Sequence, residues 1–524
     1  MRRALFLALA LAVAACGRNP RPTPTPPPPP PVAAPSVELP ARPACVPACT
    51  AVERTAREID ALLGAPSLRQ AIWSVEVQSL DSGEVLYSLN PHTLVVPASN
   101  MKIVTMAIAA ERLGWDYRFE TRLETTAPIA SGVLQGDLVV VGRGDPSVNR
   151  RIGDPDAVFT EFADALKQAG ISRIDGRIVG DDHAFADERY GFGWSWDDFA
   201  YGYQAPVGAL QFNENLVEVA VAPGATAGAP TLVTLRPDGS GLQLVNQTTT
   251  AVADSRADVD TFRFPGRSQL EVRGAVPLGG TEVVRDAAVD NPTLFFVRTL
   301  RGALEARGLP VSGEAVDVDD LPDGERAVTT AQEGAAPPRV LLRHLSPPLS
   351  EIARRLMKVS QNLYAETFLR ALSLTPGPAT VAASQEVEKE VLASWGVAPG
   401  NYALADGSGL SRHNLVSANT IVRILRAMAT DPRHAQAFEA TMPIAGKDGT
   451  ISSRMKATRA ENNVKAKTGT LMRVRALSGY MTTADGERLV FSIIANHFTV
   501  PNRTVDAAVD AALERLANFT RQPG

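Results

Sequence analysis

The sequence predicts a mixed α/β (α+β) protein whose main fold is interrupted by a large β-rich insertion. Segments without Gly or Pro, which favour helices, stand on either side of the middle of the chain. The middle itself holds short β-branched runs between Gly, Asp and Pro, which favour strands. Three short polar motifs begin at Ser99, Ser360 and Lys467, and the first gap is more than twice the second. The insertion is therefore expected between the first two motifs.

Local patterns predict the individual elements. Residues 101–113 contain neither Gly nor Pro and end at Gly114, which predicts a buried helix. After about residue 342 the chain is expected to turn helical again, because Ile352, Leu356 and Val359 would share one helix face. Further helices are expected at 154–170, 291–308 and 363–372, and strands at 134–142, 176–180, 217–221, 232–235, 270–273, 463–471, 477–481 and 489–496.

Composition describes a large globular chain of 524 residues, 45% apolar and 21% charged, with a net charge of −5. This length exceeds what one hydrophobic core holds, so two or three compact units are expected. The sequence has no block of like charge, so its charge pattern does not indicate nucleic acid as a partner. The six histidines form no His-x-x-x-His or Glu-x-x-His pair, which disfavours a metal-dependent hydrolase, and no cofactor is predicted.

The N-terminus has the pattern of an export signal. A basic start, an apolar run at 4–15 and the small residues before Cys16 predict a lipoprotein signal peptide at 1–16, with Cys16 as the lipid-modified mature N-terminus. An ordinary secretory signal cut elsewhere is the alternative. Twelve apolar residues are too few to span a bilayer, so attachment to the membrane is expected through lipid at Cys16.

Residues 17–49 are rich in proline and predict an extended tether rather than a packed structure. The tether would either set the reach of the domain that follows or serve as an inert spacer. Cys45 and Cys49 lie four residues apart near its end and are candidates for a disulfide, because the chain is expected to be exported. Such a small loop would contribute only modestly to stability.

The first motif is Ser99-Asn100-Met101-Lys102. On a helix, residues three apart share a face, so the Lys102 amine could take the proton of the Ser99 hydroxyl. A second Ser-x-x-Lys, Ser453 to Lys456, is followed by a polar segment rather than by a helix. Ser99 is therefore the predicted nucleophile, and Ser453 is interpreted as an ordinary surface serine.

The second motif, Ser360-Gln361-Asn362, is expected at or just beyond a helix end. Its hydroxyl could relay a proton to a leaving amine, and its amide could hold a substrate carbonyl or Lys102. Capping of the next helix by Ser360 and Asn362 is the alternative.

The third motif, Lys467-Thr468-Gly469-Thr470, lies in an alternating segment that suits a strand. A lysine and two hydroxyls can bind a carboxylate, and backbone N–H groups can stabilise an oxyanion. Gly469 would let a substrate lie close to the backbone. The alternative is that Lys467-Thr468-Gly469 is an exposed turn without a binding role.

The ordered set of motifs resembles the penicillin-binding protein and serine β-lactamase superfamily. The long insertion resembles the penicillin-binding protein 4 family of D-alanyl-D-alanine carboxypeptidase/endopeptidases, from about residue 50 onwards. Further matching strings are Gly142–Pro146, Trp194–Asp198, Ala205–Leu210, Asn213–Asn215 and Asp406–Arg412. The resemblance implies a transpeptidase-like catalytic domain with antiparallel sheet and helices at 50–118 and 343–524, and inserted β-rich domains at 119–342.

The resemblance also implies a mechanism and partners. Ser99 would attack the carbonyl before a terminal D-alanine or a cross-linking diamino acid, with Lys102 as base and with the N–H groups of Ser99 and Thr470 as oxyanion hole. Ser360 and Lys467 would relay a proton to the leaving amine. Asn362 would hold the peptide, while Thr468 and Thr470 would bind its carboxylate. Peptidoglycan peptides are the expected substrates and β-lactams the expected inhibitors. The N-terminal export signal, which the resemblance does not cover, predicts a periplasmic or extracytoplasmic location with a lipid anchor in a bacterial membrane.

Two other functions fit parts of the sequence. A serine β-lactamase or esterase of the same superfamily is disfavoured by the large insertion, and no convincing Glu-x-x-x-Asn loop stands between Ser360 and Lys467. A non-catalytic wall-associated lipoprotein would be expected to lose motif residues, and all are present.

Overall fold

The structure, a computed structural model, describes residues 39, 42, 49–322, 337–374 and 377–521, which belong to one compact unit. The predicted signal peptide, the lipidation site Cys16 and nearly all of the predicted tether lie outside the described residues. Cys49 is disulfide-bonded, and its predicted partner Cys45 also lies outside them. In the described part of the chain, no helix has the length and apolar character needed to cross a membrane.

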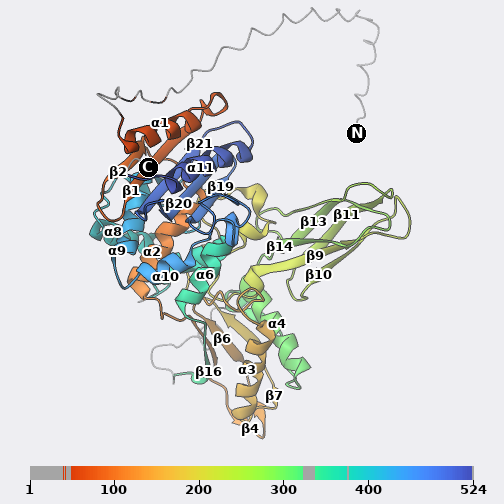
Figure 1. Ribbon diagram of the computed structural model, residues 1–524. Helices are drawn as coiled ribbons and strands as arrows, with labels where there is room; N and C mark the ends of the chain where they lie inside the picture. The colour runs from red at the N-terminus through yellow and green to blue at the C-terminus, as the bar shows by residue number, and fades with distance from the viewer. Residues whose placement is uncertain (1–38, 40–41, 43–48, 323–336, 375–376, 522–524) are drawn as a thin grey trace, which may run out of the picture. The chain divides into compact units, whose positions relative to one another are not determined.

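A five-stranded antiparallel sheet joins the two ends of the described chain. β1 pairs with β21 along its whole length, from Ile72 opposite Asn496 to Ser79 opposite Leu489. The strand order is β19–β20–β21–β1–β2 (Figure 1). The strands are β1 (Ile72–Ser79), β2 (Val85–Leu89), β19 (Lys465–Leu471), β20 (Val474–Thr482) and β21 (Arg488–Asn496).

Helices cover both faces of this sheet because its strands alternate apolar side chains between two cores. Val75 and Ile493 point into the core under α1 (Ala51–Leu63) and α11 (Asn502–Ala517), which pack together. Ile494, the next residue, faces the other core. That second core is built with α2 (Met101–Leu113), α6 (Leu349–Val359), α7 (Asn362–Ala371), α8 (Val381–Ser394), α9 (Ala418–Thr430) and α10 (Ala435–Thr441).

Helix α2 runs through the middle of this second core. Every residue from Met101 to Ala110 is buried, including Lys102 and Thr105. The helix follows the 3-10 turn η2 (Ala98–Asn100) without a break and ends at Gly114, whose φ of 83° a residue with a Cβ rarely adopts. A lysine on α2 is therefore removed from water unless a cavity reaches it.

A second five-stranded sheet lies in the predicted insertion. Its order is β15–β8–β6–β3–β16, and α4 (Pro292–Ala306) packs against β8 and β15. β3 and β16 are antiparallel neighbours, so the chain enters and leaves this region side by side. The strands are β3 (Glu120–Thr125), β6 (Leu138–Gly142), β8 (Ile178–Asp181), β15 (Ala315–Asp317) and β16 (Arg339–Leu345); α3 (Pro155–Gln168) connects the parallel pair β6 and β8.

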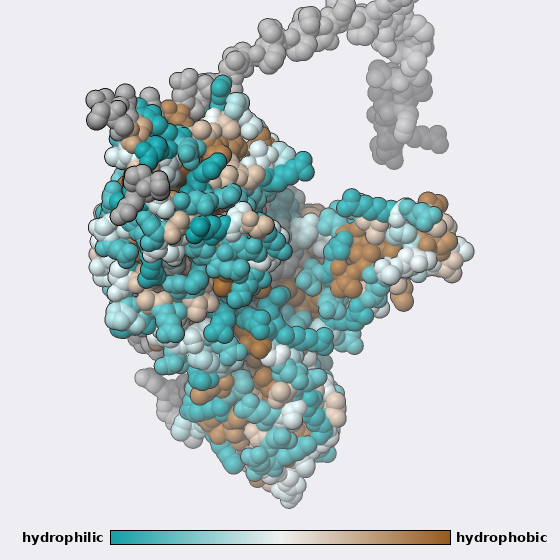
Figure 2. Space-filling model, in the orientation of Figure 1, coloured by the Kyte–Doolittle hydropathy of each residue, from teal (hydrophilic) through white to brown (hydrophobic). Residues whose placement is uncertain are grey.

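Three three-stranded sheets complete the inserted region. They are β4–β5–β7, β10–β9–β14 and β11–β13–β12. Apolar side chains near the last two sheets, such as Leu232 and Val252, are exposed. Figure 2 shows brown, hydrophobic patches over this part of the molecule. The strands are β9 (Leu216–Ala222), β10 (Leu232–Arg236), β11 (Gln243–Ala251), β12 (Asp258–Phe262), β13 (Gln269–Pro277) and β14 (Val283–Ala288). Two-residue strands are β4 (Ile129–Ala130), β5 (Val133–Leu134), β7 (Arg173–Ile174), β17 (Tyr402–Ala403) and β18 (Leu415–Val416).

The predicted mixed fold class is confirmed. Three local expectations differ from the structure. The run 134–142 is divided between β5 and β6, with Gly136 at a φ of 156° between them. The chain remains in β16 until Leu345 rather than becoming helical at about 342. Strands β1, β2, β3, β11, β12 and β14 and helices α1 and α11 were not expected. The domain boundaries at 118 and 342 stay a prediction.

Candidate active site

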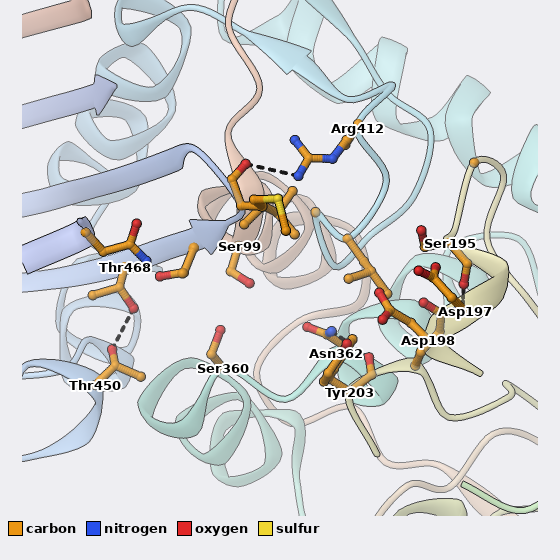
Figure 3. A pocket seen from close by; sticks show the side chains of 18 residues that line it. Ser99, Ser195, Asp197, Asp198, Tyr203, Ser360, Asn362, Arg412, Thr450 and Thr468 are labelled. Carbon is orange, nitrogen blue, oxygen red and sulfur yellow. Dashed lines mark hydrogen bonds between the residues drawn. The ribbon is translucent and has the colours of Figure 1, made fainter. Parts of the chain in front are cut away.

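The three predicted motifs meet around one cavity of about 640 Å³. Ser99, Ser360 and Asn362 line it, together with Thr468 and Thr470. Figure 3 shows the Ser99 and Ser360 hydroxyls between Thr450 and Thr468 on one side and a group of residues from the inserted region on the other. Segments that are remote in sequence therefore form a single concave site.

Ser99 lies in the turn that leads directly into α2. Lys102 Nζ donates a hydrogen bond to Ser99 Oγ over 3.0 Å. Ala98, just before the serine, has a φ of 47°, in the left-handed region that is costly for a residue with a Cβ. Gly409 packs so closely on this turn that a Cβ there would lie 1.9 Å from the Ala98 carbonyl oxygen. Neighbouring backbone thus holds the serine in an uncommon local geometry.

Lys102 is completely buried and makes three hydrogen bonds. Besides Ser99, its Nζ donates to Asn362 Oδ1 at 2.6 Å and to the Ser408 carbonyl at 2.7 Å. Burial lowers the pKa of Lys102 to about 7, while the charges of Asp406 and Glu366 oppose this shift. A large fraction of the amine is consequently neutral near pH 7 and able to accept a proton.

Two buried carboxylates shape the loop that carries Ser408. Glu366 Oε1 on α7 accepts from the Ser408 backbone N–H at 2.8 Å. Asp406 accepts from the Gly409 N–H at 2.7 Å and from the Trp194 indole N–H at 2.8 Å. These bonds fix the loop backbone, so the Ser408 carbonyl is directed at Lys102.

Ser360 and Lys467 form a second hydroxyl–amine pair. Lys467 Nζ donates to Ser360 Oγ at 2.8 Å and to the Thr468 carbonyl at 2.8 Å. Ser360 ends α6 with a φ of 62°, again left-handed. Burial, with a further contribution from the Lys102 charge, lowers the pKa of Lys467 well below its ordinary value. Both lysines of the site are therefore held away from bulk water.

Asn362 is the first residue of α7, and its amide is oriented from two sides. Its Oδ1 accepts from Lys102, and its Nδ2 donates to the Tyr203 carbonyl at 2.7 Å. Gln361 is the residue whose side chain caps α7, through the Leu363 N–H. The side chains of Ser360 and Asn362 thus contact the two lysines rather than the end of the helix.

Strand β19 forms one wall of the cavity, next to the Ser99 turn. A Cβ at Gly469 would lie 2.5 Å from the Pro97 carbonyl oxygen, so only glycine permits this approach. Asn100 Nδ2 donates to the Lys467 carbonyl at 2.9 Å, which ties the turn to the strand. Thr468 Oγ1 donates to Thr450 Oγ1 at 2.8 Å.

Several cavity residues were not predicted from the sequence. Ser195, Asp197, Asp198 and Tyr203 reach the cavity from the inserted region, and Thr450 reaches it from the turn η7 (Gly449–Ile451) (Figure 3). Ser195, Asp197 and Asp198 belong to the family-like string Trp194–Asp198, so family likeness is the signal that could have found them. Tyr203 and Thr450 belong to no such string, and no local pattern places them near Ser99.

The second Ser-x-x-Lys segment lies elsewhere. Ser453 and Lys456 are both exposed and stand in turns that follow η7. Neither residue lines the cavity described above. The two similar sequence patterns therefore occupy entirely different environments.

Among the described residues, two groups of His, Asp and Glu are close enough together to hold a metal ion. They are Glu111, Asp431 and His434, and Asp182, Asp317 and Asp319. Neither group lines the Ser99 cavity, and Arg433 forms ion pairs with Glu111 and Asp431. Hydroxyls, amines and amides surround Ser99, and the carboxylates of Asp197 and Asp198 line the cavity on the side of the inserted region.

Known proteins share this chain's sequence and fold. The model of the D-Ala-D-Ala carboxypeptidase 3 (S13) family matches residues 55–516. A D-alanyl-D-alanine carboxypeptidase of Actinomadura sp. is 36% identical over 499 residues, which cover 93% of this chain and 88% of the relative.

Two solved structures of penicillin binding protein 4 from Haemophilus influenzae are also similar. One has a TM-score of 0.76 and 26% identity, and the match covers 88% of this chain and 99% of that chain. The other, complexed with a β-lactam, has a TM-score of 0.68 and 27% identity, with 88% and 98% covered.

Proposed function

Given that this chain belongs to the D-Ala-D-Ala carboxypeptidase 3 (S13) family, we propose that it cleaves peptidoglycan stem peptides and cross-links through an acyl-enzyme on Ser99. The observation that carries this assignment is the contact between the Ser99 hydroxyl and the buried amine of Lys102. A weak alcohol nucleophile needs an adjacent base, and a lysine serves as one only when its pKa is lowered.

In acylation, neutral Lys102 accepts the Ser99 proton as Ser99 Oγ attacks the carbonyl carbon of the penultimate D-alanine. The charge that develops on the carbonyl oxygen is stabilised by the backbone N–H groups of Ser99 and Thr470. Asn362 and the Ser408 carbonyl accept hydrogen bonds from the protonated amine and keep it in place. The C–N bond then breaks, and the amine departs.

The leaving amine needs a proton, and Ser360 is positioned to give one. Its hydroxyl donates to the amine nitrogen and is reprotonated from Lys467, which contacts Ser360 Oγ. A terminal D-alanine leaves in the carboxypeptidase reaction, and the side-chain amine of a cross-linking residue leaves in the endopeptidase reaction. Water then attacks the ester carbonyl carbon and gives a proton back to Lys467 through Ser360. Protonated Lys102 returns its proton to Ser99 Oγ as the ester C–O bond breaks, so the free enzyme is restored.

The carboxylate next to the scissile bond is assigned to Thr468 and Thr470. Both line the cavity on β19, and Arg475 donates a hydrogen bond to Thr470 Oγ1. Two hydroxyls beside a cationic group suit a carboxylate. β-Lactams, which carry a carboxylate beside a strained amide, are expected to acylate Ser99 in the same way and to stay attached.

Replacement of Ser99 with Ala tests the assignment. Labelling by a fluorescent penicillin and release of D-alanine from a soluble peptide ending in D-alanyl-D-alanine should both be lost, because no nucleophile remains. A variant at Ser453, which is exposed and outside the cavity, is the matched control and should retain both activities. Persistent labelling of the Ser99→Ala variant would exclude Ser99 as the nucleophile.

We further propose that the protein acts outside the cytoplasm and is attached to a membrane by lipid at Cys16, with residues 17–49 as the tether. The basic start and the apolar run at 4–15 support this proposal. Metabolic labelling with a fatty acid should mark the wild-type protein and not the Cys16→Ser variant. Equal labelling of the two proteins would refute lipid attachment at Cys16.

A further inference from the structure

A strip of aromatic side chains leads away from the cavity along the inserted region. The aromatic strip consists of Tyr203, Tyr201, Phe262, Trp196 and Phe264. Trp196 is 57% exposed, Tyr203 46% and Phe264 44%. Exposed large aromatic residues that gather in one place commonly mark a binding surface.

The strip is continuous with the Ser99 cavity. Tyr203 lines the cavity and stacks on Tyr201, with ring centroids 5.4 Å apart and an interplanar angle of 14°. The Tyr201 hydroxyl donates to Asp260 Oδ1 on β12 over 2.9 Å. β12 ends at Phe262, so this hydrogen bond connects the inner and outer parts of the strip.

The outer part of the strip presents flat rings in a fixed arrangement. Trp196 and Phe264 are nearly parallel, with an interplanar angle of 8° and centroids 6.4 Å apart. Phe262 stands edge-on to both rings. The guanidinium groups of Arg267 and Arg273 lie 5.8 Å and 4.9 Å from the Phe264 and Phe262 centroids. These contacts hold the rings in place, so little side-chain freedom remains to be lost on binding.

Trp196 lies at the edge of the cavity. It lies in η3 (Trp196–Asp198), between Ser195 and Asp197, both of which line the cavity (Figure 3). Trp196 itself is not among the cavity residues and packs on Phe264 and Phe262 instead. The short helix therefore forms a rim, with the cavity on one side and the aromatic strip on the other.

We propose that the aromatic strip binds the glycan strand to which the stem peptide is attached. This inference rests on the proposed function. An extended peptide advances about 3.3–3.6 Å per residue, so the sugars lie several residues, and more than 10 Å, from the carbonyl at Ser99. They would thus lie beyond the rim. Sugar rings offer apolar C–H faces to aromatic rings, while their hydroxyls suit the neighbouring carboxylate and guanidinium groups.

Charge favours a sugar polymer over a lipid surface as the occupant. Three carboxylates, Asp197, Asp198 and Asp260, stand along the strip beside the guanidinium groups of Arg267 and Arg273, and Arg273 is paired with Glu271. The remaining excess of negative charge would repel the anionic headgroups of a bacterial membrane. Neutral sugar hydroxyls, by contrast, can donate hydrogen bonds to those carboxylates. The strip would thus hold the polymer while the cavity processes its peptide.

The test is a double variant, Trp196→Ala with Phe264→Ala, in the full chain. Binding of peptide-free glycan strands, measured by calorimetry, should weaken about tenfold or more, because two stacking faces are lost. Penicillin labelling and turnover of a soluble D-alanyl-D-alanine peptide should stay within about twofold. Cleavage of intact glycan-linked peptidoglycan should fall with glycan binding. Phe192→Ala is the matched control, since Phe192 is 71% exposed but packs against His413, outside the strip.

The outcomes separate this inference from the proposed function. No glycan binding by the wild-type protein, or equal binding by the double variant, overturns the inference. A loss of binding to anionic phospholipid vesicles in the double variant, with glycan binding intact, also overturns it and identifies a membrane surface instead. Failure of the wild-type protein to release D-alanine from the soluble peptide would refute the proposed function whatever the glycan result.

Discussion

Two segments of this chain share the pattern Ser-x-x-Lys, and the structure gives them opposite environments. Lys102 is completely buried on α2 and contacts Ser99, Asn362 and Ser408, and its pKa falls to about 7. Lys456 and Ser453 are exposed in turns. The comparison teaches that the Ser-x-x-Lys spacing alone does not determine whether the lysine is buried. Burial of the amine, with acceptors that orient it, is what distinguishes the first segment.

Replacing Lys102 or Lys456 should give the largest difference in acylation rate between the two Ser-x-x-Lys segments. Lys102→Met removes the base while keeping an unbranched chain, so acylation by penicillin should slow by about 10²- to 10⁴-fold. Lys456→Met should leave the rate unchanged. Stopped-flow or gel-based measurement of the second-order acylation rate gives both values. A similar rate for Lys102→Met and the wild type would remove Lys102 from the mechanism.

The lowered pKa of Lys102 predicts a pH profile. The base is active when neutral, so the acylation rate should rise with pH up to about 7 and then level off. Below pH 7 the rate should fall about tenfold per pH unit, or about a hundredfold at pH 5. Measurement of the acylation rate between pH 5 and 9 checks this expectation. A flat profile, or a midpoint near the ordinary pKa of lysine, would contradict it.

Asp406 should matter through Lys102, because it shapes the Ser408 loop and raises the pKa of Lys102. Asp406→Asn should slow acylation by about ten- to a hundredfold, since charge-assisted hydrogen bonds are lost. It should also move the midpoint of the pH profile to lower pH, because a negative charge near Lys102 is gone. Asp156→Asn, an exposed position on α3, should change neither quantity. A slower rate with an unshifted midpoint would mean that Asp406 acts through structure alone.

The smallest expected effect concerns Thr450, whose hydroxyl accepts from Thr468. Thr450→Val removes this acceptor and should raise KM for a D-alanyl-D-alanine peptide by about two- to tenfold, with little change in kcat. Steady-state kinetics would show whether KM changes while kcat stays constant. A fall in kcat at constant KM would place Thr450 in the chemical step instead.

The sequence predicted some of the elements that carry strong local signals, but not others, such as strand β1 and helix α11. Helix α2 has the bounds expected from its lack of Gly and Pro and from Gly114, because it is buried all round and nothing competes with helix propensity. Strand β11 was missed because most of its side chains are exposed and polar, so it lacks the alternation that marks a strand.

The residues of the candidate site also fall into two groups, those that could be predicted from the sequence and those that could not. Its motif residues could be chosen because hydroxyl, amine and amide chemistry is visible in short strings. Thr450 and Tyr203 could not, because they reach the cavity through η7 and the inserted region. Their roles depend on contacts between segments far apart in sequence, which no local pattern contains.

The most direct test of the central claim is to locate the covalent adduct after treatment with a β-lactam. Tandem mass spectrometry of the digested protein should find one acyl group, on Ser99, because only that hydroxyl contacts a buried amine with a pKa near 7 within a Ser-x-x-Lys segment. An adduct on Ser453, or an unmodified Ser99 peptide after full inhibition, would contradict the account.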